Sequence, residues 1–301
     1  MPPSIVLQSV TRPLGRAAFA AFFVSALVMG SLAADAGHGP VVQPRLEEQS
    51  GRLEAQYTAS IAGIPIGHGS WMVEIANNQY TVAANGTTTG LIKFFTGAHG
   101  TGAVHGTVAA GLMEPTSYGE TITWDGKIDN VRMTLAAGKV TDYDAQPPLP
   151  PAPDRVPVTD ADRRGVFDPI TSMLNHVAGN GDPVTPQACV RKVPVFDGRV
   201  RYDLRSEYKR METVKAVRGY AGPAAVCSVY FTPVAGYVPD RPAIKYLVTL
   251  RDAEVWLAPI AGTRVLVPVR FSMPTPIGTG LLQATDFVSA PLPPRTAAKT
   301  E

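Results

Sequence analysis

Three arginines in one short segment form the clearest candidate binding feature of the sequence. Arg199, Arg201 and Arg205 fall on one face of an expected strand that also carries Asp203, and Asp197 lies just before it. A guanidinium group donates paired hydrogen bonds to carboxylates and phosphates, so three of them could bind an anionic head group. The alternative is a ladder of cross-strand ion pairs on a solvent-exposed face. Arg199, Arg201 and Arg205 are therefore candidate ligands of an anion.

The two cysteines of the chain, Cys189 and Cys227, are the second chemical feature. In an exported chain, two cysteines alone predict one disulfide bond. The alternative is a redox-active or metal-binding pair, but the sequence has no Cys-x-x-Cys and no histidine beside either cysteine. We therefore predict a structural disulfide between Cys189 and Cys227.

Motifs for catalysis or cofactor binding are missing from the sequence. It contains no phosphate-binding Gly-x4-Gly-Lys-Ser/Thr loop, no Gly-x-Ser-x-Gly and no His-Glu-x2-His. His99 and His105 lie in a Gly-rich stretch, expected as a flexible loop and the rim of a strand, where only an unusual turn would let both reach one metal ion. The sequence therefore predicts no metal site, no cofactor and no enzymatic activity.

Composition sets the broad class. The chain has 301 residues, of which 45% are hydrophobic and 17% charged, so it can form a packed core and is not disordered overall. A net charge of +2 excludes a nucleic-acid binder that relies on a broad basic surface. The 28 glycines and 28 prolines are typical of short strands joined by turns.

The first residues predict export. Arg12 and Arg16 precede an apolar run from Ala17 to Leu32, and small residues follow as far as Ala36. This order is typical of a secretory signal peptide, here residues 1–36, so the mature protein is expected in the periplasm. The alternative is a retained segment that anchors the chain in the membrane, although the run is shorter than the roughly 20 residues of a usual span. Residues 37–50 are expected as a flexible lead-in.

From Leu53 onward the pattern is that of strands. Apolar and polar residues alternate, as in a strand with one buried face. Asn77-Asn78, Asp125-Gly126 and Asp197-Gly198 are expected as tight hairpin turns. We expect about twelve strands in all, one of them over residues 244–250. The predicted fold class is mainly β, with one large curved antiparallel sheet or a half-open β-barrel.

Two segments interrupt the strands. The Pro-rich residues 146–157 are expected as an extended crossing loop. Asp168 and Pro169 are favourable at the start of a helix, which predicts one short helix around residues 169–178. We expect a single β-rich domain over residues 51–290 and a disordered tail over 291–301. The alternative is two β domains divided at the Pro-rich segment.

Several motifs together indicate a known family. The segment from Leu53 to Leu91, with Gly-Ile-x-Ile-Gly and Thr-Gly-Leu landmarks, resembles the start of the bacterial exported family called domain of unknown function 3108. FDPITSML (167–174) and CVRKVPVFDGRVRYDL (189–204), with Cys227, look like the alphaproteobacterial version. VLVPVRFSMPTPIGTGLL (265–282) is similar to its closing strands. The resemblance implies an envelope protein without an assigned reaction, with a curved sheet like those of lipoprotein carriers and β-spiral proteins.

These observations lead to a functional prediction. We expect a non-enzymatic periplasmic protein of cell-envelope maintenance, whose concave sheet face binds a lipid-like ligand or an envelope protein. No nucleic-acid partner is expected, and membrane contact is expected only through a retained signal segment. The alternative is a hydrolase that acts on a cell-envelope polymer through two carboxylates, an arrangement that leaves no sequence signature.

Overall fold

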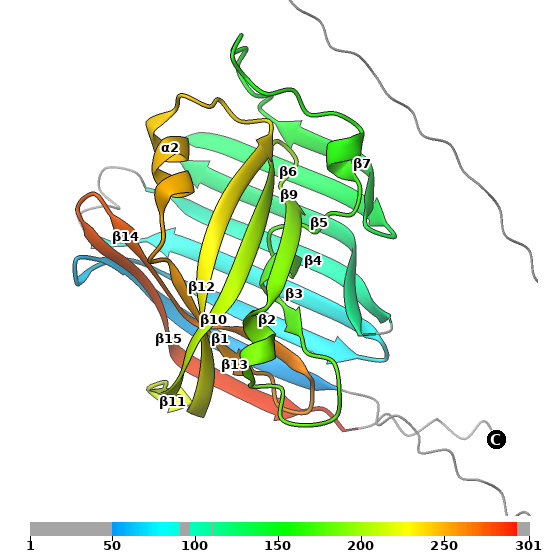
Figure 1. The fold of residues 1–301 in the computed structure, drawn as a ribbon, viewed down its shortest axis with the longest axis vertical. Coiled ribbons are helices and arrows are strands. Elements are labelled where there is room, and N and C mark those ends of the chain that lie inside the picture. Colours follow the sequence, from blue (N-terminus) through cyan, green and yellow to red (C-terminus); the bar gives the residue numbers. More distant parts are fainter. Residues whose placement is uncertain (1–49, 91–96, 110, 294–301) are drawn as a thin grey trace, which may run out of the picture. The chain divides into compact units, whose positions relative to one another are not determined.

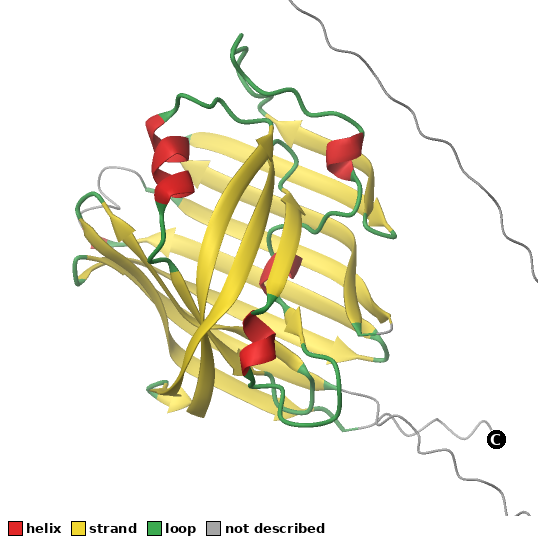
Figure 2. Cartoon of the chain, in the orientation of Figure 1, coloured by secondary structure: helices red, strands yellow, loops and turns green. Residues whose placement is uncertain are grey.

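A computed structural model describes residues 50–90, 97–109 and 111–293. The predicted signal peptide, nearly all of the lead-in and most of the predicted tail lie outside these residues. Figure 1 traces the chain and Figure 2 shows that strands make up most of it. The strands are β1 (Gly51–Ile61), β2 (Ile64–Ala76), β3 (Gln79–Thr88), β4 (His99–Ala109), β5 (Leu112–Trp124), β6 (Lys127–Ala136), β7 (Lys139–Gln146), β8 (Asn175–His176), β9 (Arg191–Phe196), β10 (Arg201–Lys215), β11 (Arg218–Gly219), β12 (Ala221–Ala235), β13 (Glu254–Pro259), β14 (Val265–Thr275) and β15 (Gly278–Pro291).

The long strands form one antiparallel sheet, as predicted. Its order is β7-β6-β5-β4-β3-β2-β1-β15-β14-β13-β12-β10-β9. Consecutive long strands therefore lie side by side except for β7 and β9, which are the two edges, and β1 pairs with β15. Strands from before and after the Pro-rich segment therefore belong to the same sheet. The minor strands β8 and β11 pair with β14 and β15, and the β11 pairing is parallel.

A short segment spans the opening between the two outermost strands, β7 and β9. Arg164 forms an isolated bridge with Lys139 of β7, and Phe167 forms one with Val195 of β9. The N–H of Val166 donates to the carbonyl of Gly138, and the N–H of Phe196 donates to the carbonyl of Phe167. The sheet is thus not closed by direct pairing of its edge strands, and residues 164–167 bridge them.

Tight turns join the first strands. Asn77 and Asn78, which connect β2 to β3, have φ values of 53° and 56°. Asp125 and Gly126, which connect β5 to β6, have φ values of 50° and 69°. Two residues with positive φ are typical of the type I′ turn, whose twist matches that of the flanking strands. The Asn77-Asn78 and Asp125-Gly126 hairpins were predictable for this reason.

The predicted helix around residues 169–178 is wrong beyond its first turn. Asp168 does cap the backbone, since its Oδ1 accepts the N–H groups of Ile170 and Thr171 at 2.9 Å. However, the structure has only a 3-10 turn there, Thr171–Met173, followed by β8. Asn175 and His176 pair with β14, and the Nδ2 of Asn175 donates to the carbonyl of Ala188 at 2.5 Å. These longer-range hydrogen bonds replace the next helical turn.

The strand predicted over residues 244–250 is also wrong, because these residues belong to an α-helix. Helix α2 covers Pro242–Thr249 and lies between β12 and β13. Pro242 stands in its first turn, where a missing N–H costs nothing and the fixed φ suits a helix. An apolar run of this length fits a strand or a helix equally well, so periodicity could not distinguish them.

The main core lies between the inner face of β1–β7 and the later strands. Figure 1 shows β9, β10 and β12 crossing over β3 to β6. The hydroxyl of Tyr80 on β3 lies 2.8 Å from the Thr171 hydroxyl, and the rings of Tyr143 and Phe196 meet edge to face at 5.8 Å. A Cβ added to Gly102 of β4 would lie 2.9 Å from Ile170. Most of the concave face is therefore filled by protein.

Candidate functional site

A groove of about 380 Å³ lies at one end of the inner face, where the later strands do not fill it. Its floor is a row of three glycines on neighbouring strands, because the register pairs Gly69 with Gly86 and Gly86 with Gly100. The same row begins at Tyr57 on β1 and ends at Ile122 on β5. Most other inward-facing positions of these strands carry side chains that fill the core, whereas these three glycines expose the backbone to the groove.

The walls of the groove are apolar. Tyr57 and Trp71 stand at one side with their rings 6.3 Å apart, and Ile66, Ile122 and Leu282 also line the groove. The hydroxyl of Tyr57 donates to the carbonyl of Pro268 at 2.7 Å, and burial raises the pKa of this phenol far above its usual value. The phenol therefore stays neutral and its polar atom has a partner. The volume lies within the range of about 300–1,000 Å³ that is usual for small-molecule sites.

Close approach of the strands explains one of the glycines. A Cβ on Gly69 would lie 2.5 Å from the carbonyl oxygen of Asn85, so no other residue fits there without moving the backbone of β3. Gly86 differs, because a Cβ at this position would have only the carbonyl oxygen of His68 nearby, at 3.9 Å. The space above Gly86 is therefore open groove.

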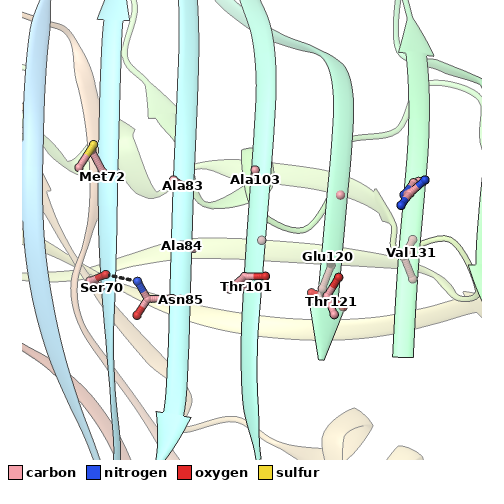
Figure 3. Close-up of a pocket in the computed structure, with 13 residues that line it drawn as sticks. Ser70, Met72, Ala83, Ala84, Asn85, Thr101, Ala103, Glu120, Thr121 and Val131 are labelled. Carbon is pink, nitrogen blue, oxygen red and sulfur yellow. Dashed lines mark hydrogen bonds between the residues drawn. The ribbon is translucent and has the colours of Figure 1, made fainter. Parts of the chain in front are cut away.

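A second hollow, of about 520 Å³, lies on the opposite face of the same strands (Figure 3). Its floor consists of the small residues Ala83, Ala103 and Gly119, which are cross-strand neighbours. A row of polar side chains borders it: Ser70, Asn85, Thr101 and Thr121. Several of these already bind one another, since the Nδ2 of Asn85 donates to the hydroxyl of Ser70 at 2.6 Å and Thr121 donates to Asn130 at 2.6 Å.

Carboxylates gather near the turn between β9 and β10. Glu120 of β5 accepts a hydrogen bond from the hydroxyl of Tyr118 at 2.9 Å, and burial raises the pKa of its carboxyl group despite this bond. Burial also raises the pKa of Asp197, whose Oδ1 accepts the N–H groups of Arg199 and Val200. Asp197 adds to the shift at Glu120 through its negative charge.

The three arginines predicted to bind an anion have separate partners. Arg199 lies before β10, where it donates to Asp129 of β6 at 2.6 Å and to the carbonyl of Pro147 at 3.0 Å. Arg201 donates to Asp203 at 2.6 Å. Arg205 pairs with Glu207 and stacks over the ring of Tyr230 at 4.2 Å. The structure does not bring the three guanidiniums together, and anion binding by them stays a prediction.

The predicted disulfide is present, with the Cα atoms of Cys189 and Cys227 5.3 Å apart. It attaches the segment before β9 to the outer face of β12. A second, smaller core lies around the bond and consists of Val184, Ala188, Cys189, Ala225, Cys227, Leu257 and Leu266. The bond is thus placed to stabilise the fold.

The histidine stretch, expected as a flexible loop and the rim of a strand, lies in strand β4 from His99 onward. His99 and His105 both lie on β4, with their side chains on its outer face. At about 3.3 Å per residue they are roughly 20 Å apart, so they cannot share a metal ion. Within the described part of the chain, no three His, Cys, Asp or Glu side chains are grouped as metal ligands.

Sequence reasoning missed the groove. Gly69 and Gly86 fall within expected strands and Gly100 in the Gly-rich stretch, and nothing in the linear sequence shows that they are neighbours. The signal that could have found them is a register argument. Counting back from the Asn77-Asn78 turn pairs Gly69 with Gly86 directly.

Comparisons with known proteins identify a family but no activity. The family model described as Protein of unknown function (DUF3108) matches residues 56–285. No curated protein matches. One similar solved structure is titled "Crystal Structure of Beta-barrel-like Protein of Domain of Unknown Function DUF1849 from Brucella abortus"; it has a TM-score of 0.42 and 9% identity, and covers 81% of this chain and 99% of that chain. Among the described residues, no helix has the length and apolar character needed to cross a bilayer.

Proposed function

This chain belongs to the family described as Protein of unknown function (DUF3108), and from that premise we propose that it is a non-enzymatic binding protein of the bacterial periplasm that holds a lipid-like molecule. The ligand's apolar chain occupies the inner groove, in contact with Tyr57, Trp71 and Leu282. The protein acts in the maintenance of the cell envelope. The disulfide supports an exported protein, since such bonds persist in oxidising compartments.

The observation that carries this proposal is the row of glycines, with open space above Gly86, beside the buried Tyr57 and the half-buried Trp71. Polar side chains are sparse in the groove, so an ion or a sugar would lose more hydration there than it would regain. An alkyl chain loses no hydrogen bonds on entry and gains about 0.8 kcal/mol for each CH₂ that it buries. The groove therefore favours an acyl chain over a polar ligand.

The test is binding of a fluorescent fatty acid, dansylaminoundecanoic acid, to the exported protein. Gly86→Leu fills the groove, because the space above Gly86 is open. We expect this variant to bind the probe at least about tenfold more weakly. The matched control is Gly119→Leu, which also enters open space but on the outer face. Wild-type binding that Gly86→Leu leaves unchanged would contradict the proposal, as would an equal loss in Gly119→Leu.

A second candidate function is hydrolysis of a cell-envelope polymer. It is supported by Glu120 and Asp197, two acids whose pKa values are raised by burial, as general acids require. The test is release of soluble fragments from isolated peptidoglycan. Release of fragments by the wild type but not by the Glu120→Gln variant would favour the hydrolase. No release by the wild type would exclude the hydrolase and leave binding as the proposed function.

A further inference from the structure

One end of the sheet exposes large apolar side chains on separate turns. We define the apolar rim as Ile64, Trp124, Ile128 and Ile277, whose exposed fractions are 67%, 45%, 58% and 74%. Ile64 follows the β1–β2 turn, Trp124 and Ile128 flank the β5–β6 turn, and Ile277 lies in the β14–β15 turn. Removing such side chains from water is favourable, so their joint exposure needs an explanation.

Strand register places these turns at the same end of the sheet. The N–H of Ala62 in the β1–β2 turn donates to the carbonyl of Thr279 at 2.9 Å, so the β1–β2 and β14–β15 turns touch. The β5–β6 turn follows Ile122, which lies in the same cross-strand row as Gly100, Gly86 and Gly69. All the rim residues therefore lie beyond the glycine row, at the end of the sheet where the groove is.

The groove continues onto this rim. Ile122 lines the groove, and Trp124, two residues further along β5, lies on the same face of the strand. On β2, Ile66 lines the groove and Ile64 lies two residues nearer the turn. Ile64 and Trp124 therefore lie next to the groove on the side of the turns.

The chemistry of the rim fits a lipid bilayer. The segments Ile61–Ile66 and Thr275–Gly280 carry no charged residue. At the β5–β6 turn the Nζ of Lys127 lies 4.8 Å from the centre of the Trp124 ring. Tryptophan is enriched at membrane–water interfaces, and lysine can place its ammonium group in the head-group region there. A protein partner would be expected to meet one contiguous patch surrounded by hydrogen-bonding groups, whereas single side chains on separate turns insert readily into lipid.

We propose that the apolar rim docks on a membrane surface, so that the groove exchanges its ligand with the bilayer without passing through water. This inference rests on the proposed binding function. The opposite end of the sheet supplies the comparison: its turns carry Asn77-Asn78 and Ala137-Gly138, and its exposed apolar residues include Leu112 and Val217. The exposed fraction of Leu112, 60%, is similar to that of Ile64, so Leu112 gives a matched control.

The experiment is flotation with vesicles of phosphatidylethanolamine and phosphatidylglycerol, using the exported protein with its N-terminus established by mass spectrometry. Every variant keeps that N-terminus, so any contribution from it is shared. We expect the Ile64→Ser/Ile277→Ser double variant to bind vesicles at least about tenfold more weakly than the wild type. Leu112→Ser is expected to bind within about twofold of the wild type.

Binding of the fluorescent fatty acid without vesicles separates the two proposals. Unchanged probe binding by the double variant, together with lost flotation, supports membrane docking by the rim. The docking proposal is overturned if the double variant floats like the wild type, if Leu112→Ser loses as much, or if a wild type that binds the probe does not float. A wild type that floats but binds no probe contradicts the groove function and leaves the rim as a membrane contact.

Discussion

The strands β2 to β6 are buried on one face, whereas β12 to β14 each have a stretch that is buried on both faces. On β6, buried Val131, Met133 and Leu135 alternate with exposed residues, and the outer face is open to solvent. On β12, Ala224, Ala225, Val226 and Cys227 are all buried in succession, because the segment before β9 covers the outer face. The difference separates two tasks: the doubly covered strands stabilise the sheet, and the singly covered strands carry the two hollows, one on each face.

The largest expected effect comes from the disulfide on the doubly covered strands. Cys189→Ser, Cys227→Ser and the double variant should each lower the free energy of unfolding by about 4 kcal/mol, because each frees the same loop in the unfolded chain. Urea denaturation of the three variants measures this. Unequal losses, or two thiols that react in the denatured, unreduced wild type, would contradict a purely structural bond.

Truncation in the smaller core should cost nearly as much. Leu266 is fully buried beside the disulfide, so Leu266→Ala should lower the free energy of unfolding by about 3 kcal/mol. Met72, which is 47% exposed on the outer face of β2, is the control, and Met72→Ala should cost less than about 0.5 kcal/mol. Equal losses in thermal or urea denaturation would remove the contrast between the two groups of strands.

A pH-dependent effect is expected where the two groups of strands meet. Asp168 accepts a hydrogen bond from the N–H of Thr171, whose hydroxyl lies 2.8 Å from the hydroxyl of Tyr80. Burial raises the pKa of the Asp168 carboxyl group to about 6, although hydrogen bonds from Thr171 and the backbone oppose the shift. The folded state therefore holds this proton more tightly than the unfolded state, so the stability is greatest at low pH and is lost as the pH rises from about 4 through 6.

Asp168→Asn removes that titration while keeping an oxygen that can accept the two N–H groups. Between pH 4 and 7 the variant should gain about 2–3 kcal/mol relative to the wild type. Urea denaturation at several pH values measures this difference. A difference that is flat with pH would contradict a buried carboxyl with a raised pKa at this position.

The smallest expected effect lies in a turn of the singly covered strands. Ala137, in the β6–β7 turn, has a φ of 48°, which is unfavourable for alanine and tolerated by asparagine. Ala137→Asn should raise the free energy of unfolding by about 0.5–1 kcal/mol. Asn77→Ala makes the reverse change at a φ of 53° and should lower it by a similar amount. Changes of the same sign in both would show that turn geometry does not decide stability here.

Local features of the fold were predictable from sequence, and features created by distant partners were not. The Asn77-Asn78 turn follows from the tolerance of asparagine for positive φ, and the disulfide follows from there being only two cysteines in a chain that is expected to be exported. The failure at residues 169–178 has a different cause. A good cap at Asp168 starts a turn, but the pairing of Asn175 and His176 with β14 sets the backbone conformation after that turn.

The candidate site was less predictable than the fold. Whether Arg199 binds a free anion depends on Asp129, which lies 70 residues away in the sequence. Likewise, the groove exists because register aligns glycines from three strands. An apolar concave face was expected, but the packing of Ile170 against Gly102 that restricts it to one end depends on tertiary contacts.

The bridging segment at residues 164–167 has a consequence for self-association. An unpaired strand edge offers backbone N–H and carbonyl groups onto which a second molecule can add a strand, the first step toward fibrous aggregates. Here one short stretch of the chain's own backbone makes contact with both outer edges, through Lys139 on β7 and Val195 on β9. β7 also carries Asp142 and Asp144 at exposed positions, and like charges would oppose the same strand in a second copy. The bridging segment and these charges both oppose strand addition at the edges of the sheet.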